Sequence, residues 1–189
     1  MAFLSATLDR VKPSPTIAVT TKAQELKAAG RDVIGLGAGE PDFDTPENIR
    51  EAAKRALDAG MTRYAPTPGD KAVREAVARK LQVENGIACK PEHITLTAGA
   101  KHAIAMCMQT LLQFGAGDEV ILPAPYYFNH EMAVTMADCR PVPVPTDSAH
   151  QLDLAAIKAA ITPRTRAIVT VSPNNPTGAV YPAATLRAV

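Results

Sequence analysis

The sequence predicts an α/β protein with a mostly parallel sheet that carries helices on both faces. From about residue 93 onward, short β-branched runs alternate with helical patterns, and this alternation is typical of βαβ units. The chain has 189 residues, enough for a sizeable core, and 47% of them are hydrophobic but only 4% aromatic, so the core should be aliphatic. In such a sheet, ligands bind beyond the carboxyl ends of the strands.

The first half of the chain should be mainly helical. Helix ends are marked by glycines, and one helix start is marked by residues that favour a first turn. The expected elements are a helix over 16–29 ended by Gly30, a short strand over 32–39, a helix capped by Thr45 with Pro46 in its first turn and running to about Asp58, and a helix over 70–85 ended by Gly86.

The second half should form the sheet and its crossover helices. The expected strands cover 93–99, 118–125, 139–145 and 165–172, and the helices between them cover 101–115, 128–138 and 152–161. Prolines interrupt the strand over 139–145, which places it near an edge of the sheet.

The charge balance excludes several classes of protein. There are 20 Lys and Arg against 19 Asp and Glu, a net charge of +1, so we expect no nucleic-acid partner and no membrane surface. No apolar run is long enough to span a bilayer, and the first residues lack a signal sequence, so a cytoplasmic protein is expected. The four histidines do not fall at metal-ligand spacings, and no metal is expected.

Unusual residues gather where the predicted strands end. Small residues at 97–100 lead into a helix that starts at Lys101, and a helix N-terminus of this kind can bind phosphate. The alternative is a tight turn that needs small residues only for packing. The segment PAPYYFNH at 123–130 places three aromatic rings together, which could stack on a planar ligand or simply fill the layer between sheet and helix.

Two further segments invite a functional interpretation. Asn174 and Asn175 precede Pro176 and Gly178, and their amides could donate to a bound ring, although Asn-Pro is also a common turn pair. The G-x-G-x-G within 35–46 does not indicate a dinucleotide site, because the glycines do not lead directly into a helix.

Five segments in this order resemble the class I aminotransferases, which are pyridoxal-phosphate (PLP) enzymes of the aspartate aminotransferase fold. The segments are GAGEPDFDTP, RYAPTPG, ITLTAGAKHA, PAPYYFNHE and SPNNPTGAVY, and the resemblance extends from Thr16 to Tyr181. It implies transfer of an α-amino group from an amino acid, aspartate or a similar one, to a 2-oxo acid. It also implies a homodimer with shared active sites.

The resemblance assigns roles to matching positions. By this resemblance, the backbone of Gly99, Ala100 and Lys101 binds the PLP phosphate, the Tyr127 ring stacks on the pyridine, and Asn175 donates to its phenolic oxygen. Tyr64 contacts the phosphate of the other subunit. The substrate is contacted by Gly39, Lys101 and Asn175. Many relatives have Trp where Tyr127 stands, so a smaller stacking surface is expected.

The resemblance also implies that part of the site lies elsewhere. In the family, the Schiff-base lysine, the aspartate that faces the pyridine nitrogen and two arginines follow the NPTG segment. We therefore expect no catalytic residue in this chain, and an arm and the start of a small domain over 1–45, followed by an incomplete PLP-binding large domain over 46–189. The chain alone is expected to be inactive. Another PLP enzyme, such as a carbon-sulfur β-lyase, and a non-catalytic remnant remain as alternatives.

Overall fold

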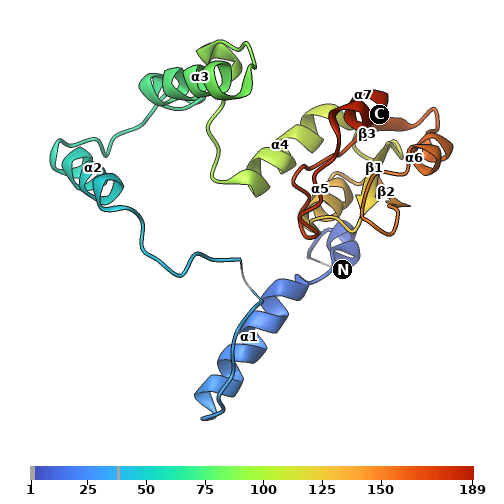
Figure 1. Cartoon of the computed structure of the whole chain (residues 1–189), viewed down its shortest axis with the longest axis horizontal. Coiled ribbons are helices and arrows are strands. Elements are labelled where there is room, and N and C mark those ends of the chain that lie inside the picture. Colours follow the sequence, from blue (N-terminus) through green and yellow to red (C-terminus); the bar gives the residue numbers. More distant parts are fainter. Residues whose placement is uncertain (1–2, 38) are drawn as a thin grey trace. The chain divides into compact units, whose positions relative to one another are not determined.

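A computed structural model of the chain describes residues 3–37 and 39–189. It divides into two compact units (Figure 1). One, here called the helical unit, comprises residues 16–97, and the other, the sheet unit, comprises residues 1–15 and 98–189. The predicted domain boundary at residue 45 stays a prediction.

The helical unit contains the three helices that the sequence predicts. They are α1 (Pro15–Ala28), α2 (Glu47–Asp58) and α3 (Lys71–Asn85), followed by the short 3-10 helix η2 (Pro91–His93). The Asp70 side chain caps α3 by accepting bonds from Ala72 N and Val73 N at 2.9 and 3.2 Å. Gly86 ends the same helix in the left-handed conformation. The predicted cap at Thr45 is wrong, because Pro46 occupies the N-cap position of α2 without a side-chain bond.

Two predicted strands are absent from the structure. The described residues of 32–39, which exclude Ala38, form no strand, and neither does the segment 94–99. A strand requires a neighbour with which to form a hydrogen-bond ladder, whereas the backbone N–H of Leu96 instead donates to Pro68 O at 2.9 Å. This close approach depends on Gly69, which has φ of +101° and where a Cβ would lie 2.5 Å from Leu96 Cδ1.

The sheet unit has the predicted parallel sheet. Its strands are β1 (Glu119–Ala124), β2 (Arg140–Pro145) and β3 (Thr165–Ile168), in the order β2-β1-β3. The other elements are η1 (Ala6–Arg10), α4 (Ala100–Leu111), α5 (Asn129–Met136), α6 (Leu154–Ala160) and α7 (Ala183–Ala188). The proline-rich strand β2 lies at an edge of this sheet, as predicted.

Alternate side chains of β1 pack on opposite faces of the sheet. Val120 and Leu122 lie in a cluster with residues of α4 and α5, while Ile121 lies in a second cluster with residues of β2 and α6. All three are fully buried. Helices on both faces of the sheet are therefore confirmed, and the two clusters hold β1 and the loop after it in place.

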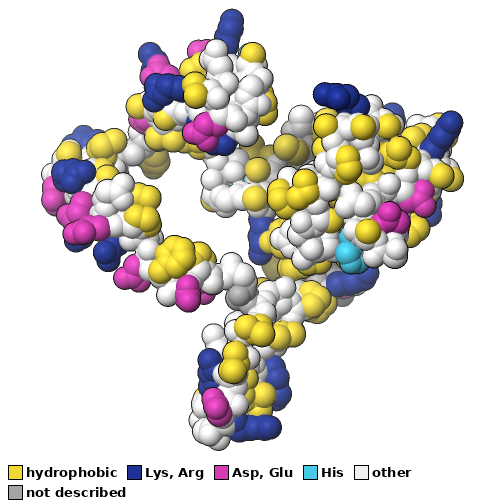
Figure 2. All heavy atoms as spheres, viewed as in Figure 1, with side chains coloured by type: hydrophobic (Ala, Val, Ile, Leu, Met, Phe, Trp, Pro, Cys, Tyr) yellow, Lys and Arg dark blue, Asp and Glu magenta, His cyan; other side chains and the backbone are white. Residues whose placement is uncertain are grey.

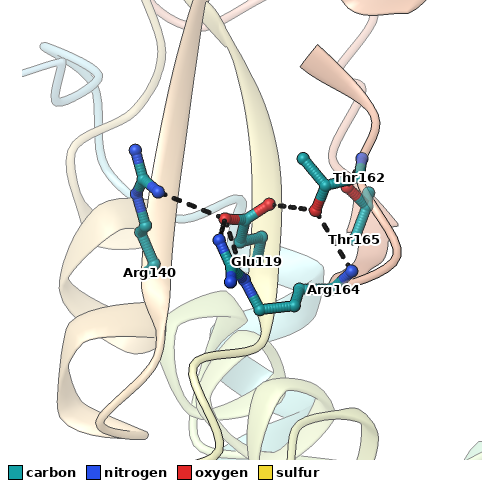
Figure 3. Close-up of polar contacts among 5 residues, drawn as sticks. All are labelled: Glu119, Arg140, Thr162, Arg164 and Thr165. Carbon is teal, nitrogen blue, oxygen red and sulfur yellow. Dashed lines mark hydrogen bonds and ion pairs between the residues drawn. The ribbon is translucent and has the colours of Figure 1, made fainter.

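A buried carboxylate joins the strands at their amino ends. Glu119 is only 1% exposed and lies between two arginines and a threonine (Figure 3). Its Oε1 accepts bonds from Arg140 Nη1 at 3.2 Å and Arg164 Nη2 at 3.1 Å, and its Oε2 accepts the Thr162 hydroxyl at 2.6 Å. The Thr162 bond is the largest cause that lowers the pKa of Glu119, burial opposes it, and the two guanidinium groups add to it.

We expect this carboxylate to make the protein less stable in acid. Because the pKa of Glu119 is lower in the folded chain than its ordinary value of 4.5, its contribution is present above that pH and is lost as the pH falls through the folded pKa. Denaturant unfolding at a series of pH values below neutrality should show the loss. Glu119→Gln should make the acid dependence shallower, with Glu25→Gln, at an exposed ion pair, as the control. Equal acid slopes for wild type and Glu119→Gln would contradict this.

The surface shows no segregation of charge by sign in the view of Figure 2, where Lys and Arg alternate with Asp and Glu over α2 and α3. Among the described residues, no helix combines the length and apolarity that a membrane crossing requires.

Candidate functional site

Two loops are tied together beyond the carboxyl ends of the strands. One is the aromatic turn, residues 125–128 after β1, and the other is the asparagine loop, residues 172–178 after β3. Asn174 connects them, because its Nδ2 donates to Pro125 O at 3.1 Å and to Thr177 Oγ1 at 2.9 Å. This side chain is buried, with 8% exposed. The segments that carry Tyr127 and Asn175 are thus held side by side.

The neighbouring asparagine has the opposite environment. The asparagine loop closes with Gly178 N donating to Asn174 O at 2.7 Å and Asn174 N donating to Ala179 O at 2.8 Å. Asn175 lies at the tip of this closed loop, is exposed and precedes a cis bond to Pro176. One asparagine therefore builds the loop, and the next presents its amide to solvent.

The ring of Tyr127 contacts two neighbouring rings. It meets the Phe128 ring edge-on at a centroid distance of 5.2 Å and the His130 ring at 5.8 Å with an interplanar angle of 86°. Burial lowers the pKa of His130, which keeps its imidazole neutral at neutral pH. The half-buried ring of Tyr127 is consequently confined in orientation but remains accessible.

The N-terminal turn of α4 supplies a third part. Gly99 caps the helix with φ of +84°, a conformation that favours glycine, and Ala100 and Lys101 follow it at exposed positions. The other end of α4 is fixed near the start of β1, since Gln113 N donates to Asp118 Oδ2 at 2.8 Å. That bond is also the largest cause that lowers the pKa of Asp118. The C-terminal end of α4 therefore lies at the amino side of the sheet, and the N-terminal turn is the opposite end of the helix.

Two further predicted residues lie in the helical unit. Tyr64 is fully exposed. Gly39 is also exposed, and a Cβ built on it would meet no atom within 4 Å. The structure thus brings together the loops of Tyr127 and Asn175 and places Gly99, Ala100 and Lys101 in the same unit, whereas Tyr64 and Gly39 belong to the other unit.

Sequence reasoning gave Asn174 a different role and assigned none to two other residues near these loops. It considered both asparagines as ligands, whereas Asn174 serves as the clamp between the loops. It also overlooked Asn129 and His130, which are buried at the start of α5. Within the described residues, neither Asn129 Nδ2 nor His130 Nδ1 has a hydrogen-bond partner. Polar residues directly after an aromatic run were the available signal.

The first turn of α4, Tyr127 and Asn175 have the chemistry needed to bind the phosphate, the ring and a ring oxygen of a phosphorylated pyridine. The exposed first turn of α4 has the backbone donors and the dipole that suit a phosphate. Tyr127 offers a ring of restricted orientation, and Asn175 offers an exposed amide on the loop that Asn174 ties to the aromatic turn. The unpartnered polar atoms of Asn129 and His130 are a further mark of a polar site, since buried polar groups are normally hydrogen-bonded.

Comparison with known proteins gives one consistent family. The sequence model "Aminotransferase class I and II" matches residues 31–189. The aspartate/prephenate aminotransferase of Cereibacter sphaeroides is 50% identical over 191 residues, covering all of this chain and 47% of that protein. The aspartate/prephenate aminotransferase of Thermus thermophilus is 46% identical and is covered to 49%.

Solved structures agree with the sequence matches. The aspartate aminotransferase from Thermus thermophilus with maleate superposes with a TM-score of 0.94 at 46% identity, over all of this chain and 49% of that one. The chain thus spans about half the length of the relatives it matches. Enzymes of this family depend on pyridoxal phosphate. With a family model that covers most of its length and relatives of nearly 50% identity, the chain belongs to the class I and II aminotransferases.

Proposed function

We propose that the protein is a PLP-dependent aminotransferase that moves an α-amino group from aspartate, or a similar amino acid, to a 2-oxo acid. The observation that carries this proposal is the Asn174 clamp, which holds the aromatic turn beside the asparagine loop at the strand ends. The relatives named aspartate/prephenate aminotransferase support aspartate as donor and make prephenate a candidate acceptor. The helical unit would contribute Gly39 to the substrate carboxylate and Tyr64 to the phosphate of a second subunit in a homodimer.

The residues of this chain would bind and orient the cofactor. The backbone N–H groups of Gly99, Ala100 and Lys101 would hold the phosphate, and the ring of Tyr127 would restrict tilting of the pyridine. The amide of Asn175 would donate to the phenolic oxygen and stabilise its anionic form, and the Lys101 side chain would meet the distal carboxylate of the substrate. When bound, the cofactor acts as an electron sink for the carbanion formed at the substrate α-carbon.

The covalent chemistry would require groups outside these residues. The family resemblance places the cofactor-bonding lysine after the NPTG segment, and no lysine follows Lys158 in this sequence. We therefore expect PLP binding but no aspartate-dependent turnover from the 189-residue polypeptide. Borohydride treatment with PLP, followed by mass spectrometry, should yield no adduct confined to one lysine. Turnover together with a single-site adduct would overturn this expectation.

A pair of glycine variants tests the phosphate assignment. Gly99 and Gly30 both have positive φ and open space around the missing Cβ. Gly99 combines φ of +84° with ψ of 170°, a conformation essentially restricted to glycine, so Ala should cost more stability at Gly99 than at Gly30, and the comparison of PLP with pyridoxal isolates the phosphate contribution. Only Gly99→Ala distorts the first turn of α4. We expect it to weaken PLP binding severalfold in equilibrium dialysis, to leave pyridoxal binding unchanged, and Gly30→Ala to change neither. Equal binding of PLP and pyridoxal by wild type would refute a phosphate site here.

A further inference from the structure

The N-terminal arm, residues 5–15, is fastened to α5 within the sheet unit. Figure 1 shows η1, in blue, beside α5. Arg10 pairs with Asp138 just beyond the end of α5. Lys12 Nζ lies 2.7 Å from Glu131 Oε1 in the first turn of the same helix. Charged contacts therefore fix the arm near both ends of α5.

Glu131 reaches in two directions. Its second oxygen, Oε2, accepts the hydroxyl of Tyr126 at 3.0 Å. Burial raises the pKa of Tyr126 to about 12, and Glu131 adds to the shift, so the phenol remains a donor at neutral pH. The bond to Lys12 is the largest cause that lowers the pKa of Glu131, which keeps this side chain ionised. A single carboxylate thus links the arm to the residue that precedes Tyr127.

The arm also shares a cavity with the residue that follows Tyr127. A cavity of about 150 Å³ lies between the arm and α5, and its walls include Val11 and Pro13 from the arm and Phe128 and Met132 from α5 and its N-cap. The Phe128 ring in turn meets the Tyr127 ring edge-on at 5.2 Å. Of the two sequence neighbours of Tyr127, Tyr126 therefore bonds the residue that holds the arm, and Phe128 lines a cavity together with the arm.

We propose that Glu131 is a positioning residue that couples the N-terminal arm to the aromatic turn and thereby sets the orientation of the Tyr127 ring. Its two oxygens are used separately, one for Lys12 and one for Tyr126, so neither partner can shift without loss of a charged hydrogen bond. The proposed function enters only in the last step, where the Tyr127 ring would face the cofactor.

The coupling can be measured on the ligand-free 189-residue chain. The variants are Lys12→Met and Glu131→Gln, with Lys12→Arg as the conservative rescue. Lys22→Met is the matched control, since it also removes an exposed Lys-Glu pair, but in the helical unit. Ring signals of ¹³C-tyrosine report the turn, and Tyr127→Phe assigns the signal among the four tyrosines. Tryptic cleavage after Arg10, followed by mass spectrometry, reports release of the arm.

We expect Lys12→Met to speed cleavage about two- to fivefold, as for loss of one exposed ion pair, and to shift the Tyr127 ring signal. Glu131→Gln should shift the Tyr127 signal further. Lys12→Arg should keep the wild-type cleavage rate and the wild-type Tyr127 signal. Lys22→Met should change neither the cleavage rate nor the signal. Faster cleavage with an unmoved Tyr127 signal would overturn the proposal, and so would no change in either readout. Circular dichroism checks that each variant is folded.

A PLP titration separates this proposal from the proposed function. If PLP perturbs the Tyr127 signal of wild type, the ring lies at the cofactor site, and Lys12→Met should weaken binding. If PLP leaves Tyr127 unmoved while Lys12→Met still shifts it, the coupling stands and the cofactor assignment of Tyr127 fails.

Discussion

Asn174→Ala should lower the free energy of unfolding by about 1–3 kcal/mol and weaken PLP binding, whereas Asn175→Ala should weaken PLP binding alone. The Asn174 amide makes two hydrogen bonds from a buried position, and its removal leaves Pro125 O without that donor. The aromatic turn and the asparagine loop would then separate. Asn175 is exposed, so its truncation should change stability by no more than about 0.5 kcal/mol.

The measurement is denaturant unfolding of the three proteins, combined with equilibrium dialysis against PLP. For Asn175→Ala, the loss of one hydrogen bond to a charged oxygen, about 1.5–3 kcal/mol, corresponds to roughly ten- to hundredfold weaker binding. Asn174 and Asn175 are adjacent and of the same type, so each variant controls for the chemical effect of replacing Asn with Ala in this loop. A stability loss at Asn175 as large as that at Asn174 would mean that the loop is not held by the Asn174 clamp.

Leu122→Ala should have the largest effect on stability, a loss of about 2–5 kcal/mol. Leu122 is 0% exposed in the cluster between the sheet and helices α4 and α5, and truncation leaves a cavity that neighbours in regular elements fill only in part. Because the net stability of a domain is about 5–15 kcal/mol, this single change could remove a large share of it.

The matched control is Leu36→Ala, the same substitution at a side chain that is 90% exposed in the helical unit. It should change the free energy of unfolding by no more than about 0.5 kcal/mol. Chemical denaturation of both variants gives the comparison. Similar losses at the two positions would show that the cluster around Leu122 is not the core of the sheet unit. Since Leu122 lies two residues before the end of β1, PLP binding should fall together with stability.

Local signals predicted the helices well, because each signal acts within a few residues. The Asp70 cap and the Gly86 terminator define α3 through bonds to the adjacent turns. The expected cap at Thr45 was wrong by one residue, because Pro46 occupies the N-cap position of α2 and has no side chain that can cap it. The strands of the sheet unit were also predictable, because β1 carries apolar residues on both faces.

The sequence by itself determined the α/β class, the family and the segments that carry the candidate site, because these depend on residue order and on contacts along the chain. The tertiary structure decided which asparagine clamps and which is presented to solvent, because burial of Asn174 depends on Pro125, 49 residues earlier. It also decided that the described residues of 32–39 and the run at 93–99 are not strands, and that the arm reaches the aromatic turn through Glu131. The physical reason is the same in each case: hydrogen-bond partners that are distant in sequence are fixed only when the chain folds.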